Sequence, residues 1–516
     1  MVTFHIIAIL IMIEFVSTFT TDETAIDWKQ CGDSGLEKID AEDVECGFLS
    51  VPLDYTRPKG STIQIAISRI KHKVSADKFQ GVILINPGGP GSSGLSLVTI
   101  GSAFPKTVSD AYDWIGFDPR GVGSSKPALY CMPTYHDGPT PDYIPRNKQL
   151  ENFWLMRSES YVRACIKNNS KLLSYMTTID VVKDMESLRV ALLQDQINFY
   201  GLSYGTYLGQ VYATLFPNRV RRMILDSSVD PRSVWYKLNI DQCSGLDYNL
   251  KMWFRWLAKY NNNFQLGETE NQVAEKWNDV VKELAINPAD GTVGPLEWIN
   301  VFTPVTYSQL PWTLFGVIFS RWVNQKDFSG LFLFHKMPNK VLVDNKYAVY
   351  LSVMCADAKW PQNWKNIRIE NWLTFKKAPI FTWYNAWHNA PCQYWPQKAN
   401  KPVHINGSNI GDILLIIGTL DAPTPFEGSL EVRRRFPRAR LIAKPGGMAH
   451  ALKPGLNQCV TTWIAKYLES GDLPTRKSHN GPDAICPPLP EPNPEIDEQH
   501  MQDEIDDVLH ERFYQF

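Results

Sequence analysis

A serine flanked by glycines is the group in this sequence best suited to nucleophilic chemistry. The stretch Asn198–Gly209 reads as a short apolar strand, the turn Gly201-Leu-Ser-Tyr-Gly205 and the first turn of a helix. A serine at such a strand-to-helix corner is held in a strained conformation with its hydroxyl presented outward. Glycines two residues before and after it avoid side-chain collisions where strand and helix cross. The pattern predicts that Ser203 is a nucleophile.

A serine hydroxyl becomes reactive only when a base removes its proton, and the base needs a carboxylate to orient it. In chains with this turn, the acid and then the histidine follow the serine. Asp421 follows the apolar run 413–418, and His450 follows the run 439–443 in a glycine-rich loop. We predict that Asp421 is the acid and His450 the base. Asp226 also follows a strand and is the rival acid, which we interpret as a structural hydrogen-bond acceptor.

Attack on a carbonyl produces an oxyanion that must be held by preorganised N–H groups. The backbone N–H of Tyr204, directly after Ser203, is one predicted donor. Gly89, in the glycine-rich turn after the apolar run 81–86, is the other. No spacing of His, Cys and Glu indicates a metal site, and the turn lacks the Gly-Lys-Ser/Thr of a phosphate-binding loop. We therefore expect acyl-transfer chemistry with no metal and no cofactor.

The segments around these residues alternate between strands and helices. Residues 62–67 alternate apolar and polar side chains, which is typical of a half-buried antiparallel strand. Continuous apolar runs, typical of strands buried on both faces, occur at 81–86, 114–118 and 413–418, and further strands are predicted at 198–202, 220–226 and 439–443. Residues 179–192 have helical periodicity. The order predicts an α/β fold with a mostly parallel sheet flanked by helices; Asp118 is expected to be structural, with Arg120 as its partner.

The character of the chain changes between residues 231 and 402. This region holds 13 of the 17 tryptophans and shows amphipathic stretches without strand–helix alternation. We predict a mainly helical cap inserted between two parts of the sheet, with most of its aromatics in a packed core and a minority lining a substrate pocket. The predicted division is a signal peptide at 1–20, a first core segment at 28–230, the cap at 231–402, a second core segment at 403–475 and a Pro-rich acidic tail at 476–516.

Composition and cysteine usage indicate the compartment. A net charge of −2 over 516 residues favours neither nucleic acid nor an anionic membrane as a partner. The apolar leader at 1–20 resembles a signal peptide, and we expect no membrane association of the mature chain. Nine cysteines suit an oxidising compartment. Sequence proximity predicts four disulfides and leaves Cys243 unpaired: Cys31–Cys46, Cys131–Cys165, Cys355–Cys392 and Cys459–Cys486. Sequons at Asn168 and Asn406 agree with a secreted or vacuolar, lysosomal-type protein.

Several motifs together resemble a known family. In sequence order they are Asn86-Pro-Gly-Gly-Pro-Gly91, Asp118-Pro-Arg-Gly-Val-Gly-Ser124, Gly201-Leu-Ser-Tyr-Gly205 and Leu225-Asp-Ser-Ser-Val-Asp-Pro231. The chain resembles the secreted tripeptidyl aminopeptidases, related to proline iminopeptidases, of the α/β-hydrolase fold, over about residues 28–475. The resemblance implies a serine exopeptidase that releases tripeptides or short fragments from free N-termini, with Ser203, Asp421 and His450 as nucleophile, acid and base. It departs from the family where Ala449 and Ala451 flank His450, since the family usually has a Gly-His-Gly turn.

An aminopeptidase of this kind needs cap carboxylates that bind the substrate's α-ammonium group. Asp357 and Glu297 are the candidates in the predicted cap. Two other functions stay open. One is an esterase or lactone hydrolase that acts on small metabolites with the same three residues. The other is a catalytically silent binding protein, against which the intact serine, aspartate and histidine argue.

Overall fold

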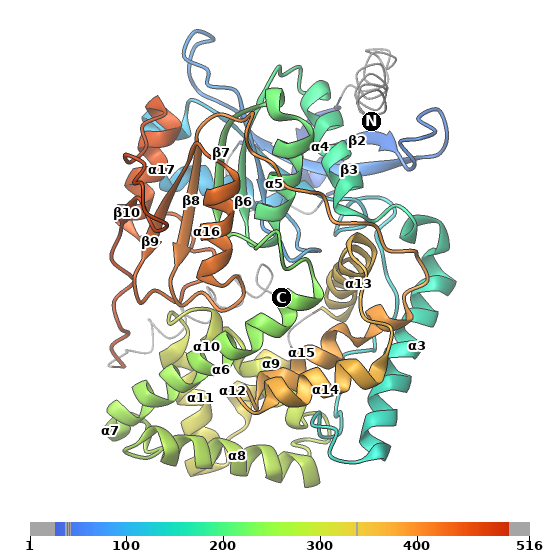
Figure 1. The fold of residues 1–516 in the computed structure, drawn as a ribbon, viewed down its shortest axis with the longest axis vertical. Helices are drawn as coiled ribbons and strands as arrows, with labels where there is room; N and C mark the ends of the chain where they lie inside the picture. Colours follow the sequence, from blue (N-terminus) through green and yellow to red (C-terminus); the bar gives the residue numbers. More distant parts are fainter. Residues whose placement is uncertain (1–25, 37–38, 40, 42, 337–338, 495–516) are drawn as a thin grey trace.

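The computed structural model describes residues 26–36, 39, 41, 43–336 and 339–494. These residues form a ten-stranded β-sheet with helices around it (Figure 1). The order across the sheet is β1-β2-β3-β5-β4-β6-β7-β8-β9-β10. Neighbours from β1 to β5 in this order pair antiparallel, and neighbours from β5 to β10 pair parallel. The strands are β1 Lys29–Gln30, β2 Val44–Pro52, β3 Thr62–Ile70, β4 Val82–Asn86, β5 Asp113–Asp118, β6 Ile197–Leu202, β7 Val220–Asp226, β8 Ile413–Gly418, β9 Ala439–Lys444 and β10 Ala484–Ile485. The predicted strands begin and end within a few residues of β3 to β9, whereas β2 was not predicted.

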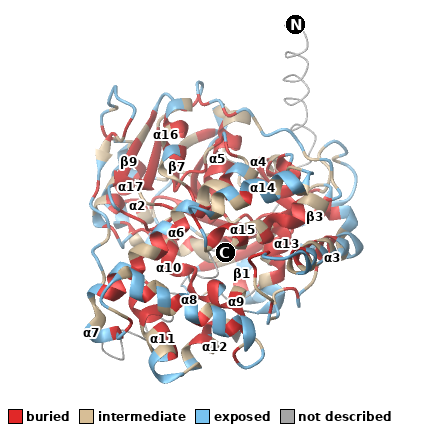
Figure 2. Ribbon diagram, turned by 60° about the horizontal axis from the view of Figure 1, so that its bottom comes forward, coloured by how far each residue is buried: buried red, intermediate tan, exposed pale blue. Residues whose placement is uncertain are grey.

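Helices cover both faces of this sheet, which explains the continuous apolar runs. Val82 and Leu84 of β4 belong to one hydrophobic cluster, while Ile83 and Ile85 belong to the cluster on the opposite face. The helices of the first face are α4 Thr178–Ala191, α5 Tyr204–Leu215 and α16 Phe426–Arg435, and those of the second are α2 Lys106–Ser109 and α17 Gln458–Ser470. Figure 2 shows the strands and the inner sides of these helices as buried. The chain therefore has the predicted α/β architecture.

Between β7 and β8 the described chain forms helices and no strand of the sheet (Figure 1, lower half). These helices are α6 Tyr236–Lys259, α7 Asn261–Phe264, α8 Glu270–Ile286, α9 Pro295–Phe302, α10 Pro304–Tyr307, α11 Trp312–Gln325, α12 Ser329–Lys336, α13 Lys340–Asp357, α14 Trp364–Phe375 and α15 Phe381–Asn389. Most of their tryptophans are buried in one aromatic cluster. Helix α3 (Lys148–Leu173) precedes the cap in sequence but packs with it, because Trp154 stacks on Trp387 at 5.8 Å. Packing thus joins a part of the first core segment to the cap.

The first part of the predicted tail is tied to both halves of the molecule. β10 pairs parallel with β9, and the Cys459–Cys486 disulfide fastens it to α17. The following residues cross to the cap, where Trp256 Nε1 donates to the carbonyl of Pro492 at 3.0 Å. The tail therefore begins as part of the sheet and then runs along the cap up to residue 494.

The structure forms the four disulfides that sequence proximity predicts, which is typical of proteins in oxidising compartments. Cys243 is free and buried, and burial raises the pKa of its thiol to about 12. Both sequon asparagines, Asn168 and Asn406, are exposed. The predicted signal peptide at 1–20 lies outside the described residues. Among the described helices, none is long and apolar enough to cross a membrane.

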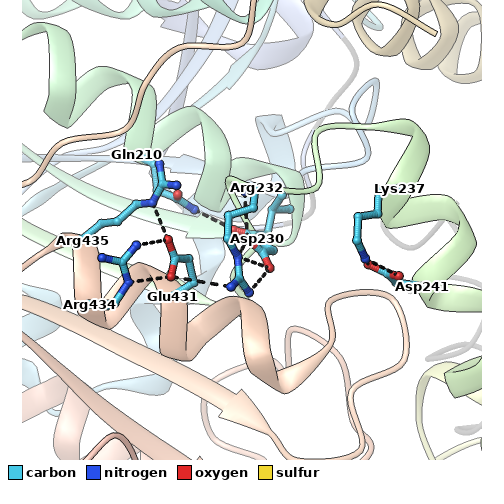
Figure 3. A network of polar contacts seen from close by, with 9 residues as sticks. Gln210, Asp230, Arg232, Lys237, Asp241, Glu431, Arg434 and Arg435 are labelled. Carbon is cyan, nitrogen blue, oxygen red and sulfur yellow. Dashed lines mark hydrogen bonds and ion pairs between the residues drawn. The ribbon is translucent and has the colours of Figure 1, made fainter. Parts of the chain in front are cut away.

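A network of ion pairs links the start of the cap to helix α16, which packs on the sheet (Figure 3). Arg232, in the connection from β7 to α6, pairs with Asp230 at 2.7 Å and lies 3.8 Å from Glu431 of α16. Hydrogen bonds from Arg434 and Arg435 hold the pKa of Glu431 down at about 2. The carboxylate therefore stays ionised, and the connection is held at the point where the chain leaves the core.

A buried carboxylate inside the cap gives a pH-dependent stability. Asp247 of α6 accepts backbone N–H groups from Ile380 and Phe381 at 3.2 and 2.9 Å, and burial raises its pKa to about 6. The unfolded value is about 4, so the folded state binds the proton more tightly, and this stabilisation is present at low pH and lost as pH rises through 6. We expect the deficit in unfolding free energy of Asp247→Asn, relative to wild type, to be about 2 kcal/mol larger at pH 4.5 than at pH 7.5.

Urea denaturation at the two pH values measures this difference. Glu275→Gln, at an exposed position of α8, is the matched control and should show the same deficit at both. A deficit for Asp247→Asn that does not change with pH would contradict the prediction.

Candidate active site

Ser203 occupies the strained corner between β6 and α5. Its backbone angles are φ 54° and ψ −124°, in a region that residues other than glycine rarely adopt. A Cβ on Gly201 would lie 2.4 Å from the carbonyl oxygen of Gly205, and one on Gly205 would lie 2.5 Å from that of Asn86. Both glycines are required by close backbone approach, as the sequence predicts. The backbone N–H of Ser203 donates to the carbonyl of Asp226 at 3.1 Å, which fixes the corner against β7.

The glycine-rich turn after β4 packs directly on this corner. A Cβ on Gly88 would lie 2.8 Å from the backbone nitrogen of Tyr204 and 2.6 Å from the carbonyl oxygen of Leu202. Gly88 and the predicted donor Gly89 have φ of 97° and 103°, which suits only glycine. Tyr204 is the first residue of α5, so its backbone N–H has no acceptor within the helix. The turn and the helix start therefore bring the two predicted oxyanion donors to one edge of the sheet.

His450 and Asp421 are in direct contact at the same edge. The Nδ1 atom of His450 lies 2.9 and 3.0 Å from the two carboxylate oxygens of Asp421. Both side chains are buried, with exposed fractions of 4% and 0%. Thr424 also holds the carboxylate, since its N–H and its hydroxyl donate to Asp421 Oδ1 at 2.9 and 3.0 Å. The same hydroxyl lies 3.4 Å from His450 Nδ1. This arrangement orients the imidazole and leaves its Nε2 atom for a second partner.

Asp226, the rival acid, has a different environment. Its carboxylate accepts the hydroxyl of Ser227 at 3.3 Å, and burial raises its pKa to about 6 despite the nearby Lys444. The Ser227 hydroxyl in turn accepts the backbone N–H of Ala451 at 2.8 Å. Asp226 and Ser227 thus link the loop of His450 to the strand beside Ser203. Their contacts agree with the interpretation of Asp226 as structural.

Ser203, Ser227 and Ala451 share a strained conformation. All three have φ between 49° and 62°, although none is glycine. Such strain persists only where the surrounding structure enforces it, and it concentrates at functional sites. Glycine would adopt the positive φ of residue 451 without strain, whereas Ala451 takes this backbone region at a cost.

Asp118 is structural, as expected, but the prediction that it pairs with Arg120 is wrong. It accepts hydrogen bonds from the Ser93 hydroxyl at 2.5 Å and from the backbone N–H of Gly94 at 3.0 Å, and so braces the glycine-rich turn. Arg120 instead forms two bonds of 2.7 Å to Asp184 of α4. A fully buried guanidinium needs a carboxylate that can accept two N–H groups at once, and Asp118 is already committed to the turn.

The two predicted ammonium ligands, Asp357 and Glu297, are occupied within the protein. Glu297 is buried and accepts the N–H and hydroxyl of Thr140 at 3.2 and 2.8 Å. Asp357 accepts the N–H and hydroxyl of Thr178 at 2.8 and 2.5 Å. Burial raises the pKa of Asp357 to about 6. The structure gives these carboxylates anchoring contacts, and the hypothesis that they bind substrate gains no support from it.

Residues of the cap form hydrogen bonds with the loops that carry Asp421 and His450. The backbone N–H of His450 donates to the carbonyl of Tyr307 at 2.9 Å, and the two rings meet edge to face at 5.7 Å. Asn249 of α6 donates to the carbonyl of Leu420, next to Asp421, at 3.0 Å. Within the described residues, no three His, Cys, Asp or Glu side chains gather as a metal site would require.

Sequence reasoning did not identify several of these supporting residues. Thr424 lies three positions after Asp421 in a loop rich in proline and threonine, so its place near the acid was a usable signal. Gly88 directly precedes Gly89, the residue that the pattern predicts as an oxyanion donor. Tyr307 carries no signal, because its position depends on how the cap folds back over the sheet.

Comparisons with known proteins agree with this geometry. Residues 81–287 match the family model of the alpha/beta hydrolase fold, and residues 378–480 match that of the TAP-like proteins. A tripeptidyl aminopeptidase of Streptomyces coelicolor is 35% identical over 482 residues, which cover 91% of this chain and 87% of the relative. The chain belongs to the tripeptidyl aminopeptidase family. It is a serine hydrolase of the α/β-hydrolase fold.

Two less similar relatives of this chain are named as a protease and as an esterase. The serine protease Hip1 of Mycobacterium tuberculosis is 26% identical, with 87% of this chain and 89% of the relative covered. A carboxylesterase B of the same organism is 27% identical, with 87% of this chain and 88% of the relative covered. Both comparisons extend over core and cap together.

Proposed function

We propose that this protein is a secreted serine aminopeptidase that releases tripeptides from free N-termini through an acyl-enzyme. The observation that carries the proposal is the His450–Asp421 pair at the sheet edge where the strained Ser203 corner lies. The 35% identity to a tripeptidyl aminopeptidase over nearly the whole chain supports the substrate class. The disulfides support an oxidising, secretory compartment.

In the proposed mechanism, His450 removes the proton from the Ser203 hydroxyl as it attacks the scissile carbonyl. The N–H groups of Tyr204 and Gly89 hold the oxyanion. His450 then protonates the leaving amine, and water, activated by the same histidine, hydrolyses the acyl-enzyme. Asp421 keeps the imidazole in the tautomer with its proton on Nδ1 and stabilises the imidazolium that forms.

A tripeptide anilide with a free amino group, compared with its N-acetylated form, tests the proposal. We expect hydrolysis of the free amine and loss of most activity on acetylation, because the enzyme must recognise the α-ammonium. The alternative is an esterase or lactone hydrolase, which the carboxylesterase B relative favours. Hydrolysis of esters with no activity on the free-amine anilide would establish the alternative.

Thr424 gives a prediction about positioning. In Thr424→Val the hydroxyl that donates to Asp421 Oδ1 is lost, while the backbone N–H remains. One hydrogen bond to a charged group contributes about 1.5 kcal/mol, so we expect kcat to fall about tenfold with little change in KM.

The anilide assay measures this effect. Thr313→Val is the matched control, since the Thr313 hydroxyl is buried without a hydrogen-bond partner among the described residues. Equal kcat values for both variants would show that Thr424 does not position the acid.

A further inference from the structure

The loop that carries His450 is held at both of its ends. At its start, the backbone carbonyl of Lys444, the last residue of β9, accepts the N–H of Gly447 at 3.0 Å. At its end, the N–H of Ala451 donates to the Ser227 hydroxyl at 2.8 Å. The position of the imidazole therefore depends on two anchors, one at the end of β9 and one just after β7.

The side chains of Lys444 and Asp226 lie on the same face of the sheet, with β8 between their strands. Asp226 pairs with Ile416 of β8, and Ile416 pairs with Ile442, two residues before Lys444. Alternate residues of a strand share a face, and Ile416 and Ile442 both belong to the cluster on the α17 side. A Cβ on Gly418, the β8 partner of Lys444, would lie 2.3 Å from a carbonyl oxygen of the histidine loop. The loop therefore crosses the sheet on this same face.

Three polar atoms on this face are buried and have no hydrogen-bond partner among the described residues. They are Lys444 Nζ, Asp226 Oδ2 and the hydroxyl of Tyr200. Tyr200 shares the face because it pairs with Ile224, two residues before Asp226. The three side chains belong to residues that are at most 2% exposed. Burial raises the pKa of Asp226 to about 6, and the positive charge of Lys444 opposes this rise, so the two charged groups lie close together.

A buried ammonium needs an acceptor. Buried polar atoms of folded proteins are nearly always hydrogen-bonded, and ordered water takes this role where no protein group is within reach. An ammonium that has left bulk water also needs a negative charge nearby. The carboxylate of Asp226 supplies that charge to Lys444. A contact between them through water closes a ring of polar contacts that joins the two anchors of the loop.

We propose that Lys444 is a positioning residue for His450, whose ammonium acts by holding the Asp226 carboxylate through buried water. The ammonium fixes the carboxylate, the carboxylate accepts the Ser227 hydroxyl, and that hydroxyl holds the backbone beside the histidine. The inference rests on the proposed role of His450 as the base.

Steady-state hydrolysis of the tripeptide anilide by wild type and three variants tests the inference. In Lys444→Met we expect kcat to fall about tenfold with KM within about twofold of wild type, because the histidine is misplaced while the substrate site is unchanged. Adding Asp226→Asn to Lys444→Met should restore kcat to within about threefold of wild type. Asparagine still accepts the Ser227 hydroxyl, and no uncompensated charge is left buried. Lys453→Met, at an exposed position three residues after His450, is the matched control and should keep the wild-type kcat.

A second measurement needs no variant. A high-resolution crystal structure of the wild-type protein should show water within hydrogen-bond distance of both Lys444 Nζ and Asp226 Oδ2. Circular dichroism and thermal unfolding verify that each variant is folded. If Lys444→Met does not fold, the crystal structure still decides.

Three results would overturn the inference. The first is a wild-type kcat in Lys444→Met. The second is a folded double variant whose kcat is no higher than that of Lys444→Met, which would give the lysine a role independent of the carboxylate. The third is a crystal structure in which the ammonium contacts other acceptors and has no link to Asp226.

Failure of the proposed function gives different results. Equal activity of wild type and His450→Ala would refute the proposed base. Hydrolysis of esters alone would refute the peptidase, and kcat of the same variants on an ester would then test Lys444.

Discussion

Ser203→Ala is expected to lower kcat by about 10⁴- to 10⁶-fold and to abolish labelling by a fluorophosphonate probe. Alanine removes the only atom that forms the acyl-enzyme, and the oxyanion donors and substrate binding that remain supply a small residual rate. The positive φ of residue 203 is unfavourable for alanine as well as for serine, so the variant should fold with nearly wild-type stability. The anilide assay and gel-based labelling measure the two effects.

Ser228→Ala is the matched control for this variant. Ser228 lies two residues after Asp226, and its buried hydroxyl has no hydrogen-bond partner among the described residues. It should keep kcat and labelling at wild-type levels. Labelling that persisted in Ser203→Ala would assign the nucleophile to another residue. The absence of labelling in wild type would favour the hypothesis that the chain is a catalytically silent binding protein.

Asp421→Asn is expected to lower kcat by about 10⁴-fold, whereas Asp226→Asn should lower it less than tenfold. Asparagine at 421 can donate to His450 Nδ1 and so favours the tautomer whose Nε2 carries the proton and cannot accept one. The carboxylate at 226 lies one hydroxyl away from the histidine loop, through Ser227, and contacts no imidazole nitrogen among the described atoms. Its replacement therefore leaves the tautomer unchanged.

Steady-state kinetics of the two asparagine variants, with thermal unfolding to verify folding, decide between the acids. A larger loss in Asp226→Asn than in Asp421→Asn would reverse the assignment. Comparable losses in both would mean that the loop of His450, held by Ser227 and Ala451, is as important as the acid itself.

Much of the fold follows from local pattern. Val82 to Ile85 are all apolar because alternate side chains face two different helical layers, and such a run predicts a central parallel strand by itself. Gly201 and Gly205 predict the corner, because no other residue fits where their Cβ positions meet backbone oxygens. Strand β2 was not predicted, because its buried and exposed positions do not alternate regularly along the strand. The path of α3 into the cap depends on the stacking of Trp154 on Trp387, which no local pattern encodes.

By itself, the sequence predicted strands β3 to β9, the serine corner, the cysteine pairs and the order of serine, acid and base, because each depends on near neighbours or on a fixed chain order. Only the tertiary structure shows how the two carboxylates differ: Asp421 contacts the His450 imidazole, whereas Asp226 accepts the Ser227 hydroxyl. It likewise shows that Asp357 and Glu297 already have hydrogen-bond partners within the protein. These findings depend on contacts between residues far apart in the chain, and such contacts form only when the cap closes over the sheet.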